Sequence, residues 1–64
     1  MANIGKNIRK FRTELGLTQE GLAIKAEVKY TTLTKIEAGV VKNPRIDIVV
    51  KIAQALRVDI KSLL

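Results

Sequence analysis

The sequence predicts an all-α fold in which five short helices pack around one core. Apolar residues recur at intervals of three and four in several segments, the period of a helix with one buried face. Capping residues and glycines stand at the ends of these segments, and the single proline, Pro44, falls between two of them. The length of 64 residues is enough for one domain only.

The first helix is expected to run from Asn3, as its N-cap, to about Glu14. Its apolar positions repeat at intervals of four, three and four, and they are Ile4, Ile8, Phe11 and Leu15. Gly16 is expected to end this helix, and Leu17 would pack back on the next one as a hydrophobic staple.

The rest of the chain is organised around residues 18–39, which we interpret as two short helices joined by a tight turn. Thr18 is the expected N-cap of the first of these, because its hydroxyl can accept an unpaired backbone N–H. Glu27 and Val28 would form the turn, and Gly39 would end the second helix in a left-handed conformation. The predicted inward residues are Leu22, Ala23, Ala26, Leu33 and Ile36.

The outer face of the second helix in this segment is polar and cationic. It consists of Lys29, Tyr30, Thr31, Thr34 and Lys35. A helix with such a face can enter the major groove of DNA, where it meets base edges and phosphates. These five residues are therefore our candidate base-reading set.

Two positions in the segment leave alternatives open. Gly21 is either a tolerated defect within a helix or a place where a side chain would obstruct a neighbour or a phosphate. Lys29 stands where a Ser or Thr commonly caps a helix, so the helix could begin late, with Thr31 or Thr32 as its cap.

After a loop at 40–45, a fourth helix is expected from Ile46 to Leu56, with an inward stripe of Val49, Ile52, Ala53 and Leu56. Ile48 and Val50 fall outside the stripe and are either half-buried or an exposed patch for a partner. Asp59 is the expected N-cap of a final turn at 60–64, in which Leu63 closes the core. Leu64 is either frayed or part of a dimer contact.

The composition excludes several classes of site. The chain has no cysteine and no histidine, so we expect no disulfide, no metal site and no cofactor. No apolar run approaches the roughly 18–20 residues of a membrane span, and no signal peptide is visible, so we expect a cytoplasmic, nucleoid-associated protein. The net charge is +6, and five basic residues against two acidic ones lie between Lys25 and Arg45. This excess indicates a polyanionic partner.

The order and spacing of these features resemble the phage-repressor and Cro type of DNA-binding domain, also called the XRE-like family. The matching positions are Ile8, Arg12, 16–19, Leu22, Ala23, Ala26, Val28, 32–37, Gly39, Asn43, Pro44, Leu56 and Val58. The resemblance covers nearly the whole chain. It implies a compact five-helix, lambda-repressor-like domain over residues 1–64, with the helix-turn-helix at the second and third helices. Such a stretch fits a complete small protein or a domain of a larger one.

The resemblance also implies roles for individual residues. The residues expected to contact DNA phosphates are Thr18, Gln19, Lys42, Asn43 and Arg45. Arg12 and Glu37 match a pair that forms a partly buried salt bridge, which would make Glu37 a structural acid. The residues expected at a dimer contact are Val58, Asp59, Ile60 and Leu64.

These interpretations lead to a sequence-specific DNA-binding transcriptional regulator, a homodimer on a palindromic operator in double-stranded DNA. One alternative is a DNA-binding antitoxin or another interaction module, which would bind protein through Ile48, Val50 and Leu64. An enzyme is the other, and the residues argue against it: there is no Cys or His, no glycine-rich phosphate loop and no pair of carboxylates at acid/base spacing.

Overall fold

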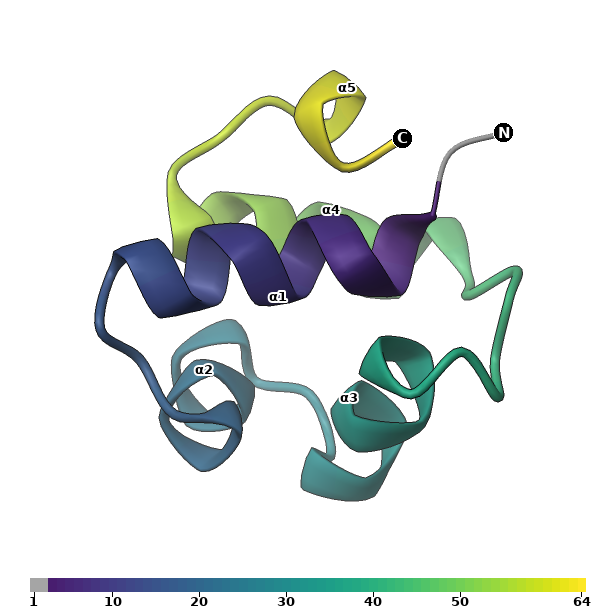
Figure 1. Ribbon diagram of the computed structural model, residues 1–64, viewed down its shortest axis with the longest axis horizontal. Helices are drawn as coiled ribbons and strands as arrows, with labels where there is room; N and C mark the ends of the chain where they lie inside the picture. Colours follow the sequence, from purple (N-terminus) through teal and green to yellow (C-terminus); the bar gives the residue numbers. More distant parts are fainter. Residues whose placement is uncertain (1–2) are drawn as a thin grey trace.

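The computed structural model describes residues 3–64, and that part of the chain contains helices and no strand. The helices are α1 (Ile4–Glu14), α2 (Gln19–Ala26), α3 (Tyr30–Glu37), α4 (Ile46–Leu56) and α5 (Ile60–Leu63). In Figure 1, α1 lies in front of α4, with α2 and α3 on one side of this pair and α5 on the other. The prediction of five helices in an all-α fold is confirmed. None of the described helices has the length and apolar character needed to cross a bilayer.

Most of the predicted helix ends are confirmed. The Asn3 side chain accepts a hydrogen bond from the Lys6 N–H at 3.0 Å, and the Thr18 hydroxyl accepts one from the Gly21 N–H at 2.9 Å. Gly16 and Gly39 have φ values of 72° and 81°, the left-handed conformation that ends a helix.

The starts of α3 and α5 lack a side-chain cap. Helix α3 begins at Tyr30, so neither Thr31 nor Thr32 is its cap. Lys29 takes the N-cap position without a side-chain hydrogen bond, and its carbonyl accepts the Leu33 N–H at 3.1 Å. Asp59 occupies the N-cap position of α5, as predicted, although its side chain accepts no hydrogen bond there. In both cases the first N–H groups of the helix have no side-chain acceptor, and at an exposed helix start water can take that place.

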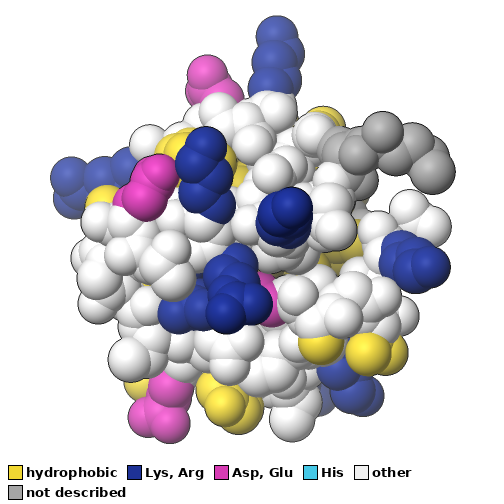
Figure 2. Space-filling model, viewed as in Figure 1, with side chains coloured by type: hydrophobic (Ala, Val, Ile, Leu, Met, Phe, Trp, Pro, Cys, Tyr) yellow, Lys and Arg dark blue, Asp and Glu magenta, His cyan; other side chains and the backbone are white. Residues whose placement is uncertain are grey.

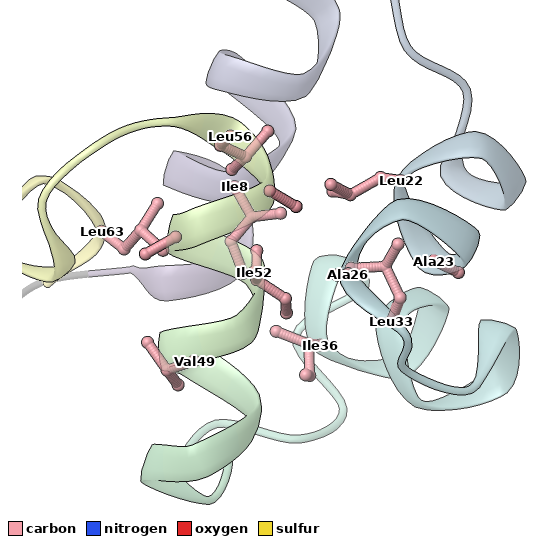
Figure 3. Close-up of a cluster of buried hydrophobic side chains, with 12 residues drawn as sticks. Ile8, Leu22, Ala23, Ala26, Leu33, Ile36, Val49, Ile52, Leu56 and Leu63 are labelled. Carbon is pink, nitrogen blue, oxygen red and sulfur yellow. The ribbon is translucent and has the colours of Figure 1, made fainter.

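The core is a single cluster to which all five helices contribute. Its members are Ile8, Leu22, Ala23, Ala26, Leu33, Ile36, Val49, Ile52, Ala53, Ala55, Leu56 and Leu63. Apolar side chains consequently appear only as small patches on the surface seen in Figure 2. Figure 3 shows labelled side chains of different helices directed toward one another. Helix α5 closes the cluster, because Leu63 is fully buried and its carbonyl accepts a hydrogen bond from the Asn7 side chain at 2.9 Å.

Leu15, Ile48 and Val50 are apolar residues that the core does not fully bury. Leu15 is 52% exposed and not part of the core, because it is the C-cap residue of α1 and the helical period no longer directs its side chain inward. Ile48 is half-buried and packs against the core, whereas Val50 is 37% exposed. The two residues outside the α4 stripe therefore have different environments.

Helices α1 and α3 approach most closely at Gly5. A Cβ atom built on this glycine would lie well inside van der Waals contact with the carbonyl oxygen of Ile36. The Ile36 oxygen and the Gly5 Cα that would carry the Cβ both belong to helical backbone, so neither can move aside cheaply. Gly5 therefore sets the distance between α1 and the helix that carries the candidate base-reading residues.

We expect Gly5→Ala to lower the free energy of unfolding by about 1–3 kcal/mol, because α1 and α3 must separate to admit the methyl group. Thermal unfolding followed by circular dichroism would measure this change. Gly21→Ala is the control: its Cβ would lie 3.1 Å from the Thr18 hydroxyl, and the better helix propensity of alanine, about 1 kcal/mol, opposes that crowding. Equal melting temperatures for Gly5→Ala and the parent protein would contradict the close-approach argument.

Candidate nucleic-acid interface

The turn between α2 and α3 sets the direction in which α3 projects. Glu27 occupies the left-handed region with φ 58° and ψ 42°, and the Val28 N–H donates to the Ala23 carbonyl at 3.0 Å. A non-glycine residue costs about 1–2 kcal/mol in this conformation. Val28 packs against the core and helps to hold the turn. The expected turn at these two residues is present.

The candidate base-reading side chains lie on the side of α3 that faces away from the core. Leu33 and Ile36 are buried, at 0% and 1% exposure, and they direct the opposite face outward. The structure places four of the five candidates in exposed positions: Lys29, Tyr30, Thr31 and Lys35. The fifth, Thr34, is half-buried, and its hydroxyl donates to the Thr31 carbonyl at 2.9 Å.

The candidate phosphate-binding residues flank this face on both sides. Thr18 is exposed at the start of α2, and Gln19 beside it is half-buried. Lys42, Asn43 and Arg45 are exposed on the loop between α3 and α4. The Arg45 guanidinium lies 3.4 Å from the Asp47 carboxylate. Both side chains are largely exposed, so this pair contributes less than about 1 kcal/mol to stability. The Arg45 guanidinium therefore stays available to a DNA phosphate.

The structure brings the two candidate sets together. Lys29, from the base-reading set, lines the same hollow as Asn43 and Arg45, from the phosphate set. That hollow lies between the turn that precedes α3 and the loop that follows it. A duplex that contacts the outer face of α3 would therefore also meet this loop.

Arg12, Glu37 and Gln19 form one hydrogen-bonded group that joins three helices. Arg12 Nε donates to Glu37 Oε2 at 2.9 Å, and Arg12 Nη2 donates to Glu37 Oε1 at 3.1 Å. Arg12 Nη1 donates to the Leu17 carbonyl at 2.8 Å, and Gln19 Nε2 donates to Glu37 Oε1 at 3.2 Å. The side chains of Arg12 and Glu37 are 12% and 3% exposed. Glu37 therefore takes little part in the surface potential, since it is covered and paired.

Sequence reasoning missed three features of the molecule. The contact between Gln19 and Glu37 and the bond from Asn7 to Leu63 join residues far apart in the chain, and no local pattern indicates them. Gly5 did leave a trace in the sequence, as a glycine within an amphipathic helix. Within the described range 3–64, no group of three or more potential metal ligands occurs.

A protein-family model described as helix-turn-helix, of the XRE type, matches residues 8–63. The chain belongs to this family. The family and the fold are those of DNA-binding transcription regulators and not of enzymes. The resemblance inferred from the sequence is thereby confirmed.

Solved structures agree with this assignment. The helix-turn-helix chain is similar to SinR, the master regulator for biofilm formation, in complex with DNA, with a TM-score of 0.91 and 35% identity over 94% of this chain and 95% of that one. It is also similar to SinR in the SinR/SinI complex, with a TM-score of 0.92 and 36% identity over 95% of this chain and 59% of that one. A third similar structure is the restriction-modification controller protein C.AhdI from Aeromonas hydrophila, with a TM-score of 0.91 and 28% identity over 98% of this chain and 94% of that one.

We expect Glu37→Ala to cost about 3–5 kcal/mol of stability, because it leaves the Arg12 guanidinium largely buried without an anionic partner. Urea unfolding would measure the loss. Glu14→Ala is the matched control, because Glu14 is exposed at the end of α1 and should change stability by less than about 0.5 kcal/mol. A midpoint for Glu37→Ala that coincides with that of Glu14→Ala would remove the structural role assigned to the ion pair.

Proposed function

We propose that this helix-turn-helix domain is a sequence-specific transcription regulator that places α3 in the major groove of double-stranded DNA, as a homodimer on a palindromic operator. The observation that supports this most is the outward face of α3. Its polar and cationic side chains are exposed opposite Leu33 and Ile36, which anchor the helix in the core. Within residues 3–64, the exposed side chains of that face make no hydrogen bond or ion pair with the rest of the domain.

The residues of α3 differ in what they can recognise. Lys35 can donate to O6 or N7 of guanine, and Thr31 can hydrogen-bond a base or contact a thymine methyl group. The Thr34 hydroxyl already donates within α3, so toward a base it would act as an acceptor. Tyr30, at 50% exposure, can lay its ring along a sugar or reach a phosphate with its hydroxyl.

Phosphate contacts from the start of α2 and the loop after α3 would fix the position of α3 in the groove. Thr18 and Gln19 would supply them on one side, and Lys42, Asn43 and Arg45 on the other. Such contacts carry no sequence information, but they set the orientation of the domain on the duplex. The residues that would position the domain on the DNA phosphates are thus different from the α3 residues that would read the bases.

A dimer would supply the contact area that one domain of this size lacks, with half-sites about 34–36 Å apart. Of the residues expected at its contact, Val58 and Ile60 are half-buried against the domain's own core. Asp59 and Leu64 are exposed, and Leu64 keeps 52% of its surface accessible. We therefore assign the dimer contact chiefly to these two residues.

A protein-interaction module is the second candidate. Ile46 and Val50 lie one turn apart on α4 and are 65% and 37% exposed. SinR, to which this chain is similar, also occurs in a complex with SinI. Of the three residues expected on such a surface, Ile48 packs against the core, whereas Val50 and Leu64 are exposed.

Selection from a pool of random duplexes, repeated at two salt concentrations, tests the proposal. We expect enrichment of a palindrome, with binding that weakens steeply as salt rises. Sedimentation on the enriched duplex would then show two chains bound. Salt-dependent binding without any enriched sequence would contradict specific recognition and favour the interaction module.

DNA binding should respond differently to the loss of one positive charge from α3 and from the loop after it. We expect Lys35→Gln to weaken operator binding by about 1–3 kcal/mol and to relax the preference at one base pair. Lys42→Gln removes the same charge from the loop. It should weaken binding to all duplexes equally and lower the slope of log Kobs against log salt by about 1. Binding curves for the operator and a scrambled duplex separate these outcomes. An unchanged base preference in Lys35→Gln would count against Lys35 as a reader.

A further inference from the structure

A shallow hollow lies where α1, α2 and α3 meet, and its lining includes a cation not yet assigned a role. The lining residues are Arg9, Arg12, Gln19, Thr34, Glu37 and Ala38. Gln19 belongs to the candidate phosphate set and Thr34 to the candidate base-reading set. The hollow therefore opens between the two surfaces proposed to contact DNA, and α1 reaches it through Arg9.

The two arginines of the hollow are in different states. Arg12 is 12% exposed, and three of its N–H groups bind Glu37 and the Leu17 carbonyl. Arg9 is exposed, and its side chain makes no hydrogen bond or ion pair within residues 3–64. The charge of Arg12 is balanced by Glu37, so the hollow carries one net positive charge, that of Arg9.

Glu37 also determines which atoms of Gln19 face the hollow. A carboxylate only accepts hydrogen bonds, so the amide nitrogen of Gln19, and not its oxygen, must face Glu37 Oε1. That nitrogen carries two hydrogens, and Glu37 uses one of them. The Thr34 hydroxyl directs its hydrogen to the Thr31 carbonyl and does not compete for an acceptor in the hollow. One N–H of Gln19 is thus left for an acceptor from outside the chain.

We propose that Arg9 and the second amide N–H of Gln19 bind one backbone phosphate of DNA in this hollow. This makes α1 a third DNA-contacting element beside α2 and α3. Phosphate suits the site, because it carries one negative charge and several acceptor oxygens, and a guanidinium can bind two of those oxygens at once. Glu37 acts as a positioning residue, since it holds the Gln19 amide in the required orientation. The proposal rests on the proposed function.

The face of the domain in Figure 2 is basic. Lys and Arg side chains gather in the middle of the face on view, beside one recessed acidic group. The hollow is open rather than enclosed, which suits a group on a long polymer better than a small molecule that must be surrounded.

Arg9→Gln tests the proposal on the operator found by selection. A variant that loses one phosphate contact should lower the slope of log Kobs against log salt by about 0.9. It should also weaken binding to the operator and to a scrambled duplex by the same factor, because a phosphate contact carries no sequence information. Arg9→Lys should retain most of the slope. An unchanged melting temperature is expected, since Arg9 is exposed.

Lys61→Gln is the matched control. It removes the same charge from α5, which lies on the other side of the α1 and α4 pair from α2 and α3 (Figure 1). If Arg9→Gln and Lys61→Gln have the same salt slope while the parent protein binds its operator selectively, the Arg9 site is wrong and the proposed function stands. If the parent protein selects no duplex, both proposals fail.

Neutral methylphosphonate groups, introduced one at a time along the operator backbone, locate the phosphate. At one position per half-site, the neutral group should weaken operator binding by the parent protein. It should leave operator binding by Arg9→Gln unchanged, because that variant has already lost the contact. Lys61→Gln should keep the sensitivity of the parent protein at that position. A sensitivity profile for Arg9→Gln that equals the parental profile at every position would overturn the proposal.

Discussion

The ion pair between Arg12 and Glu37 is the interaction on which the rest of this domain depends. It joins α1 to α3 with two hydrogen bonds, and the same arginine binds the carbonyl of Leu17 in the link to α2. The Glu37 side chain is almost completely covered. A buried charge is tolerated only when it is paired, so each partner makes the other necessary. The pair thereby favours one arrangement of the three helices over others with the same apolar contacts.

This arrangement separates the positions that hold α3 from those that it offers to a partner. Leu33 and Ile36 lie in the core, and Gly5 allows α1 to approach the backbone of α3 closely. The exposed side chains of α3 make no hydrogen bond or ion pair within residues 3–64, so their chemistry can vary with little cost to the fold. Covering Glu37 also withdraws one negative charge from the basic surface, although Glu27 remains exposed at the turn.

Much of the fold was predictable because its causes are local. Helical periodicity gave the buried stripes, and short-range hydrogen bonding gave the caps at Asn3 and Thr18 and the left-handed glycines. The departures from the local rules fell where a rule has a substitute. Lys29 and Asp59 stand at helix starts where water can replace a side-chain cap, and Leu15 lies just beyond the last helical residue.

The sequence by itself determined the five helices, their order, the inward face of each and the identity of the family, because these depend on spacing along the chain. Only the tertiary structure decided which polar groups meet. The Gln19 amide reaches Glu37, Asn7 reaches the carbonyl of Leu63, and Arg9 comes to line one hollow with residues of α2 and α3. The reason is physical: such contacts depend on the angles and distances between helices, which the packing of the whole core sets.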